Sequence, residues 1–137
     1  MTFDDESKEF AAEVASLHRF FEEWFNGSNR RAIEEFSDRL DQRFTIVAPT
    51  GEVSDCDTIV ERVRRAAGTN TTRISTRDAT LSYAGPVMLG SYIERHESGD
   101  TVTERLATVA IVRDNSIPTG FRWLLVHETW IEPNPRI

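Results

Sequence analysis

The sequence predicts a single α+β domain in which helices come first in the chain and pack on a strongly curved antiparallel sheet that follows. Two observations predict this class. Residues 7–67 carry the spacing of amphipathic helices around one short hairpin. Residues 71–131 are rich in β-branched and aromatic side chains interrupted by turn residues. Segregation of the two patterns favours helices covering a sheet over alternating strands and helices.

Size and charge narrow the class further. The 137 residues suit one domain, and the formal net charge of −7 argues against nucleic acid as a partner. The sequence has no apolar run of the ~20 residues that span a bilayer, and its acidic start is unlike a signal peptide. We therefore expect a cytoplasmic protein with no membrane contact, in which residues 1–6 and 132–137 are frayed.

Three helices are predicted in the first half of the chain. The first covers Ser7–Asn26, and Gly27 follows it as a usual helix-ending residue. The second covers about Arg30–Leu40, with Asn29 as its cap. The third covers about Asp55–Ala67, capped by Ser54 or Asp55. The first helix carries an apolar stripe at three- and four-residue spacing: Phe10, Val14, Leu17, Phe21 and Trp24.

The predicted strands begin with a minimal hairpin, in which Phe44–Ala48 is followed by a Pro-Thr-Gly turn and by Glu52-Val53. Four long strands follow over Thr71–Tyr83, Val87–His96, Thr101–Arg113 and Phe121–Ile131. The last of these is the most apolar. One of its faces would carry Trp123, Leu125, His127 and Thr129. The other would carry Arg122, Leu124, Val126, Glu128 and Trp130.

Four stretches give the chain a resemblance to the nuclear-transport-factor-two-like (SnoaL-like, ketosteroid-isomerase-like) superfamily. They are Phe20–Gly27, Phe44–Val53, Thr108–Asp114 and Trp123–His127. The resemblance covers about residues 7–130 and implies a cone-shaped fold, with three N-terminal helices closing a pocket inside the sheet. Relatives often carry a second histidine two residues after the first, and here Thr129 stands at that place.

What the resemblance implies about activity is broad. Superfamily members include isomerases, dehydratases, cyclases, small-ligand binders and association modules, and they commonly dimerise through the sheet. The ketosteroid isomerases use a tyrosine on the first helix with two acids, whereas the first helix here has no tyrosine. Fold alone does not decide among these activities.

His127 is the first candidate for chemistry. If the cone is right, the face that carries His127 points into the pocket, where an imidazole could act as a general base or as a donor to a ligand carbonyl. The alternative is a buried histidine with a structural hydrogen bond.

Glu94 and Glu104 form the second candidate, and the turn between their strands decides it. A two-residue loop at Gly99-Asp100 would set Glu94 opposite Arg105, giving structural cross-strand ion pairs. A three-residue loop would set Glu94 opposite Glu104, and such a pair would share a proton and form an acid/base site. Charge matching favours the first arrangement.

The remaining predicted site residues line the pocket: His18, Trp24, Tyr92, Thr108, Trp123, Leu125 and Thr129. For His18 the alternative is an ordinary position on the surface of the first helix. Cys56 stands at a helix start, where a thiol can be activated, but no basic residue lies near it in sequence, which favours a structural cysteine. The spacing of histidines and cysteines matches no metal motif, and there is no nucleotide-binding glycine loop. We expect no metal and no cofactor.

Two functions follow. The first is a pocket protein that binds an apolar, carbonyl-bearing small molecule, or acts on it as a small isomerase, dehydratase or cyclase. The second is an interaction module with a filled pocket and no chemistry. A homodimer through the outer sheet face is expected in either case, with these apolar residues at the contact: Val109, Ile111, Leu124, Val126 and Trp130.

Overall fold

The computed structural model describes residues 2–28 and 31–131 of the chain. Its elements in chain order are α1 (Phe3–Asn26), α2 (Glu34–Ser37), β1 (Leu40–Val47), β2 (Val53–Asp55), α3 (Cys56–Arg65), β3 (Arg73–Tyr83), β4 (Met88–Ser98), β5 (Thr101–Arg113) and β6 (Phe121–Trp130). The predicted frayed residues 132–137 lie outside the described part.

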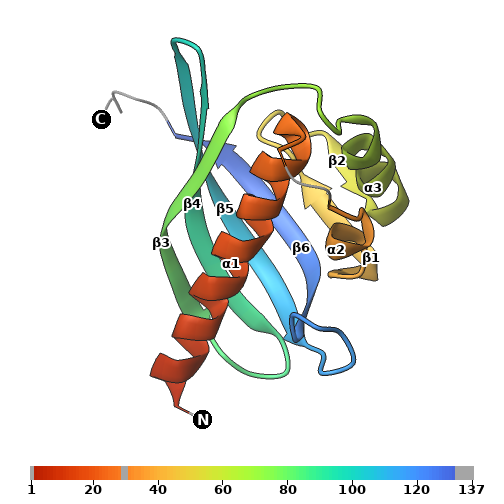
Figure 1. Cartoon of the computed structure of the whole chain (residues 1–137). Coiled ribbons are helices and arrows are strands. Elements are labelled where there is room, and N and C mark those ends of the chain that lie inside the picture. Colours follow the sequence, from red (N-terminus) through yellow and green to blue (C-terminus); the bar gives the residue numbers. More distant parts are fainter. Residues whose placement is uncertain (1, 29–30, 132–137) are drawn as a thin grey trace.

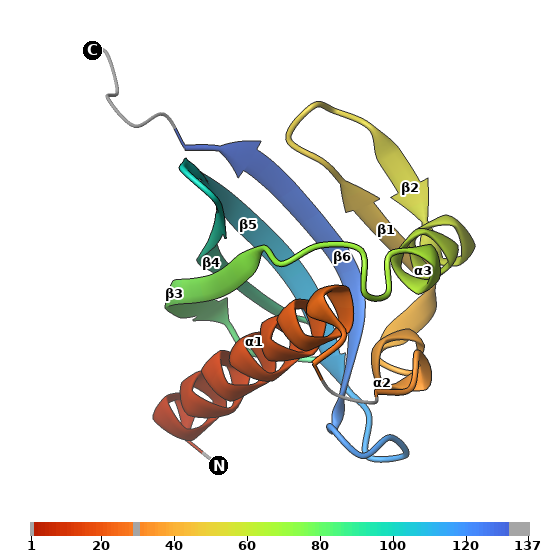
Figure 2. The ribbon, with the colours of Figure 1, turned by 45° about the horizontal axis from the view of Figure 1, so that its top comes forward.

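One curved sheet holds all six strands in the order β2-β1-β6-β5-β4-β3, and it does not close into a barrel. The long helix α1 crosses the concave side of the sheet, and α2 and α3 lie at the side of β1 and β2 (Figures 1 and 2). The α+β class and the curvature are confirmed. The prediction of a wholly antiparallel sheet is wrong at one pair, because β6 returns to lie parallel to β1 while the other neighbours are antiparallel.

The first helix begins earlier than predicted. The Thr2 hydroxyl accepts a hydrogen bond from the backbone N–H of Asp5, and the Asp5 carboxylate accepts one from the N–H of Thr2. This reciprocal cap satisfies two of the otherwise unpaired N–H groups of the first turn and starts the helix at Phe3. Gly27 ends it as predicted, in the left-handed conformation at φ 70°. Residues 3–6 are therefore helical, not frayed.

The predicted second helix is reduced to the single turn of α2. The predicted cap, Asn29, and the first residue, Arg30, lie outside the described residues. At the other end, Leu40 begins β1 and pairs with Trp123 of β6. The backbone N–H of Trp123 also donates to the carbonyl of Arg39 at 2.6 Å. Strand pairing therefore overrides the helical pattern in this segment.

The hairpin and the third helix agree with their predictions. Val53 pairs with Val47, and the Asp55 side chain caps α3 by accepting from the N–H of Thr58 at 2.8 Å. The helix ends at Arg65, two residues before the predicted end.

A β-bulge in β6 changes which residues face the core. Ile111 of β5 pairs with Trp123, whereas the preceding Ala110 pairs with Leu125, so Leu124 has no partner on β5. An extra residue on one strand shifts the alternation of side chains by one position. Trp123 therefore faces the core before the bulge, and Val126 faces it after the bulge.

The bulge overturns both predicted faces of the last strand. Beyond Leu124 the inner face carries Val126 and Glu128, while Leu125, His127 and Thr129 are exposed. The predicted dimer face is wrong for the same reason. Val109, Ile111 and Val126 are buried against the concave side. The exposed apolar residues of the outer face are instead Leu89, Leu106 and Leu125.

A buried polar cluster fixes α1 and β6 to each other. The indole N–H of Trp123 donates to Glu13 at 2.9 Å, and the Arg39 guanidinium lies 3.4 Å from the same carboxylate. Trp123 is fully buried and both charged groups are nearly so. Burial is the main reason that the pKa of Glu13 is raised, and the contacts with Trp123 and Arg39 act against it. Buried charges of this kind are tolerated when each has a partner.

No helix in the described residues is long and apolar enough to cross a bilayer. The fold thus leaves the concave side of the sheet, under α1, as the place where a cavity can form.

Gly90 of β4 packs so closely against Phe10 of α1 that one added methyl group should destabilise the fold. Gly90→Ala would place its new methyl carbon 2.4 Å from the Phe10 ring, which is fully buried. Overpacking of this kind costs about 1–3 kcal/mol, so the free energy of unfolding measured in urea should fall by that amount.

Gly85→Ala is the matched control, because its methyl would meet the ring of Tyr83, which is 54% exposed and free to move aside. Equal losses in both variants would contradict the steric explanation, as would the failure of Phe10→Leu to relieve the Gly90→Ala defect.

Candidate functional site

A cavity of about 280 Å³ lies between α1 and the concave face of the sheet. Its wall is mostly apolar and aromatic. These lining residues come from the helices and from β1, β3 and β6: Leu17, Phe21, Phe25, Phe36, Leu40, Phe44, Ile46, Ile59, Val63, Ile74, Trp123 and Val126. An apolar cavity of this size with a few polar groups is the usual form of a small-molecule site.

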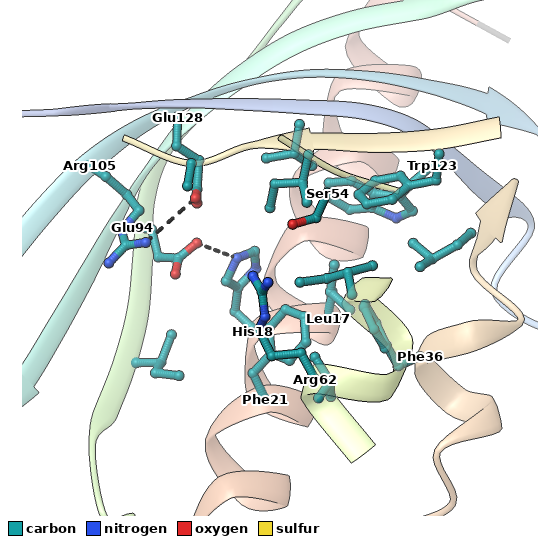
Figure 3. Close-up of a pocket in the computed structure, with 18 of the residues that line it drawn as sticks. Leu17, His18, Phe21, Phe36, Ser54, Arg62, Glu94, Arg105, Trp123 and Glu128 are labelled. Carbon is teal, nitrogen blue, oxygen red and sulfur yellow. Dashed lines mark hydrogen bonds and ion pairs between the residues drawn. The ribbon is translucent and has the colours of Figure 1, made fainter. Parts of the chain in front are cut away.

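Five polar side chains gather at one end of the cavity, and they come from four different elements. They are His18 of α1, Glu94 and His96 of β4, Arg105 of β5 and Glu128 of β6. Figure 3 shows this end of the cavity, where the Glu94 carboxylate faces the His18 ring and where Arg105 and Glu128 lie beside Glu94. The three strands are neighbours, and the strand pleat directs all of these side chains to the concave face.

Two histidines hold the Glu94 carboxylate. His18 Nε2 lies 2.8 Å from Glu94 Oε1, and His96 Nε2 forms a hydrogen bond with Glu94 Oε2. The other ring nitrogen of His18 donates to the backbone carbonyl of Val14 at 2.8 Å. Since a carbonyl can only accept, His18 Nδ1 carries a hydrogen, and the contact with Glu94 needs a second proton between the two side chains.

The position of that second proton follows from the charges. Burial alone would lower the pKa of His18, but the Glu94 carboxylate and the hydrogen bonds outweigh it, and the net pKa is raised. Burial alone would raise the pKa of Glu94, but the contacts with His18 and His96 hold it well below its usual range. Both shifts favour the imidazolium and carboxylate form of the pair.

Glu128 is the second carboxylate at this end of the cavity, and its surroundings shift its pKa in the direction opposite to that of Glu94. It is buried, and its nearest cation is Arg105, whose Nη1 lies 3.5 Å from Glu128 Oε1. Burial, and then the negative charge of Glu94, raise the pKa of Glu128 above its usual value. Two carboxylates at one end of the cavity thus have pKa values shifted in opposite directions.

Arg105 has hydrogen-bonding capacity to spare. Its guanidinium lies over the ring of Trp130 at 4.8 Å, and its Nε is buried without a hydrogen-bond partner among the described residues. A buried donor of this kind is uncommon, because most buried polar groups are paired. It is an unsatisfied donor in a residue that lines the cavity, with almost no accessible surface of its own.

Tyr92 and Trp123 form the aromatic wall next to the polar end. The Tyr92 ring meets both the His18 ring and the Trp123 ring edge-on. Burial, and the charges of Glu94 and Glu128, raise the pKa of Tyr92 well above its usual value, so its hydroxyl remains protonated.

Three of the predicted pocket residues are placed in the cavity wall: His18, Tyr92 and Trp123. The alternative of His18 as a surface residue is wrong, because His18 is buried against Glu94. The expectation that His127, Leu125 and Thr129 face the pocket is also wrong, since the bulge turns them outward. Thr108 pairs with His127 across the strands and is exposed on the same outer face.

The other predicted residues divide as follows. Trp24 packs beside the cavity without lining it, and its indole N–H donates to the carbonyl of Val63 at 2.6 Å. Glu94 lies opposite Arg105 across the two-residue Gly99-Asp100 loop, as charge matching favoured. Glu104 consequently lies on the outer face with Arg77 and Arg95, so the shared-proton pair with Glu94 does not form.

Sequence reasoning missed Glu128 and Ser54, which both line the cavity. Strict alternation placed Glu128 on the outer face, and only the bulge brings it in. Ser54 was considered as a helix cap, whereas the cap is Asp55 and Ser54 faces the cavity from β2. The hairpin register could have indicated its position, because Ser54 pairs with Ile46 and paired residues lie on the same face of the sheet.

Cys56 shows no sign of activation. It is half-buried against the core, and burial, followed by the charges of Asp57 and Asp55, raises the pKa of its thiol. Within the described residues, no three His, Cys, Asp or Glu side chains are grouped as a metal site.

The His18–Glu94 pair predicts a pH-dependent stability. A raised folded-state pKa means that the contribution of His18 is fully present below the ordinary histidine value of 6.5 and is lost as the pH rises through the folded-state pKa. The contribution of Glu94 is present above its ordinary value of 4.5 and is lost in acid. His18→Gln leaves a buried carboxylate without its cation and should cost roughly 3–5 kcal/mol.

Urea unfolding at several pH values measures this. The stability difference between the natural protein and His18→Gln should be largest between about pH 5 and 6.5 and should shrink towards pH 9. His127→Gln, on the exposed outer face, is the matched control. A difference that does not change with pH would contradict the charged pair.

Comparison with known proteins was informative for structures only. No protein-family model matches the sequence, and no curated protein has significant similarity to it. Among solved structures, an NTF2-like protein of unknown function from Pseudomonas aeruginosa is 26% identical, with a TM-score of 0.82 over 90% of this chain and 99% of that one.

Two more distant structures extend the similarity. A candidate dehydratase of the NTF2-like family from Streptomyces avermitilis is 16% identical, with a TM-score of 0.69 over 96% of this chain and 99% of that one. A domain of unknown function with a cystatin-like fold from Nostoc punctiforme is 15% identical, with a TM-score of 0.67 over 96% of this chain and 80% of that one. The resemblance predicted from the sequence is confirmed: this chain has the cystatin-like fold of the NTF2-like proteins.

Proposed function

We propose that the cavity binds a small, largely apolar molecule bearing a carbonyl group, and that the polar end moves a proton on the carbon next to that carbonyl. Isomerisation and dehydration both use this step. The observation that carries the proposal is the pair of carboxylates, Glu94 and Glu128, whose pKa values are shifted in opposite directions at one end of an apolar cavity. Such a division assigns different roles to two acids in one site.

Glu128 is the proton-transfer group in this scheme. Burial and the charge of Glu94 raise the pKa of Glu128, which makes its carboxylate a stronger base for this step than an ordinary glutamate. It is buried and lines the cavity, so water competes little for its proton. Within residues 2–28 and 31–131, its one cationic contact is with Arg105, at 3.5 Å.

Arg105 stabilises the product of that transfer. Removal of a proton beside a carbonyl places negative charge on the carbonyl oxygen. The guanidinium of Arg105 lines the cavity and, with its Nε–H unpaired among the described residues, would supply the donor for that oxygen. A preorganised donor in a site shielded from water is a large source of rate acceleration.

Glu94 acts through its charge rather than through its proton. The two histidines on its oxygens hold it as an anion. That fixed negative charge contributes to the raised pKa of Glu128. His18 and His96 are therefore positioning residues, and His18 does not donate to the ligand because both of its nitrogens are already engaged.

The cavity limits the size of the ligand. A volume of about 280 Å³ accommodates roughly ten non-hydrogen atoms, if each occupies about the 30 Å³ of a liquid water molecule. Cyclic ketones of one ring fit this volume and match its aromatic wall.

Exchange of deuterium into a ketone tests the step without knowledge of the natural substrate. Single-ring ketones incubated in D₂O with the protein should gain deuterium next to the carbonyl, detected by NMR. Glu128→Gln should slow this exchange by about 10²–10⁴-fold, the usual contribution of a general base. Glu104→Gln, on the outer face, should leave it unchanged. No acceleration with any ketone that binds would contradict the catalytic role.

We also infer a homodimer, because a second surface is too apolar to be left in water. Leu89, Ala110 and Leu125 lie in one row across β4, β5 and β6 on the convex face. Ile93 and Leu106 form a second apolar pair on the same face, beyond the row of Ser91, Thr108 and His127. This face supports the alternative function, an association module, and is compatible with a ligand in the cavity.

Light scattering at micromolar concentration tests the dimer. The natural protein should have twice the mass of one chain, and Leu106→Glu, on this face, should reduce it to one. Val102→Glu, in the turn-proximal part of β5, is a control of equal charge. A monomeric natural protein would contradict the inference.

A further inference from the structure

Ser54 places a further polar group in the cavity, on β2 and not on the strands β4, β5 and β6 that carry most of the polar end. Its side chain belongs to β2, is only 5% exposed and lines the cavity. Figure 3 shows its oxygen turned into the cavity on the side of His18. The hydroxyl has no hydrogen-bond partner among the described residues.

The Ser54 hydroxyl keeps some accessible surface, unlike the fully buried unpaired atoms of the described residues, Arg39 Nη1 and Arg105 Nε. Because Ser54 lines the cavity, that hydroxyl can meet a polar atom there, whereas an alanine or valine in the same apolar wall could not. The neighbouring Asp55 supplies the cap of α3, so Ser54 is not needed there. The hydroxyl is therefore free to serve a molecule in the cavity.

The strand pairing separates Ser54 from the reactive end. Ser54 pairs with Ile46, and Ile46 pairs with Val126 of β6. Two strand spacings put the backbone of Ser54 roughly 10 Å from that of Val126, and Glu128 lies one step further along the same face. The side chains between them, Ile46 and Val126, are apolar. A single ligand group cannot reach both polar sites, whereas the two ends of one molecule can.

We propose that the ligand is bifunctional, with a carbonyl at Arg105 and Glu128 and a second oxygen, held by Ser54, across an apolar ring. The assignment rests on the proposed function of the polar end. A serine hydroxyl can donate to a carbonyl or accept from a hydroxyl, so either group satisfies it. A carboxylate is disfavoured, because Arg62, the cation that lines this part of the cavity from α3, is already paired with Glu52 at 3.0 Å.

A matched set of ligands tests the inference by protein-observed NMR titration. Cyclohexanone carries one oxygen, 4-hydroxycyclohexanone and 1,4-cyclohexanedione carry a second neutral one, and 4-oxocyclohexanecarboxylate carries a charged one. The natural protein should bind the two neutral bifunctional compounds about fivefold more tightly than cyclohexanone, which is the usual gain from one hydrogen bond.

Ser54→Ala should abolish that fivefold gain and leave the affinity for cyclohexanone unchanged. Ser54→Cys keeps nearly the same volume with a weak donor and should lose most of the gain, which separates the lost hydrogen bond from any packing defect. Ser91→Ala, on the outward side of β4, is the control and should retain the full gain.

The outcomes distinguish this inference from the proposed function. Binding of cyclohexanone with no gain from a second neutral oxygen overturns the role of Ser54 alone. A gain that persists in Ser54→Ala does the same, as does a preference for the carboxylate compound that is lost in Arg62→Gln. Binding of none of the four compounds to the natural protein overturns the proposed function and the inference together.

Discussion

The bulge at Leu124 is the constraint on which the site depends. Before it, Trp123 faces α1 and donates to Glu13, which ties the last strand to the first helix. After it, the same strand turns Glu128 into the cavity. A regular strand could direct only one of these two residues inward, because their positions differ by an odd number. The structural anchor and the candidate acid therefore share one strand only because an extra residue lies between them.

The second constraint is the cost of placing charge under α1. Isolated buried charges are very unfavourable, and this fold places its buried charges in contacting pairs. Glu13 meets Arg39, and His18 meets Glu94. The weakest pairing is that of Glu128 with Arg105, because the two charged groups are 3.5 Å apart and the pKa of Glu128 is raised. The residue proposed to transfer the proton is thus the one whose charge is least completely compensated.

Local chemistry was readable from the sequence, and distant chemistry was not. The cap of α3, predicted at Ser54 or Asp55 and found at Asp55, and the favoured register of Glu94 against Arg105 follow from neighbouring residues and a two-residue turn. The partner of His18 lies 76 residues away, and no pattern within the helix could identify it. No glycine or proline marks the bulge in the sequence. Regular alternation of side chains past Leu124 therefore predicts His127, and not Glu128, on the inner face.

The two walls of the cavity come from separate parts of the chain. The polar end is built on β4, β5 and β6, whereas β1, β2 and α3 form a small unit that joins the rest of the sheet through one parallel pair of strands. Changes in this unit would alter the shape and polarity of one wall without moving the carboxylates. In evolutionary terms, the wall that would select a ligand and the residues proposed to transfer a proton can change independently. Two chains that share these polar residues can then differ in the molecule that fits the cavity.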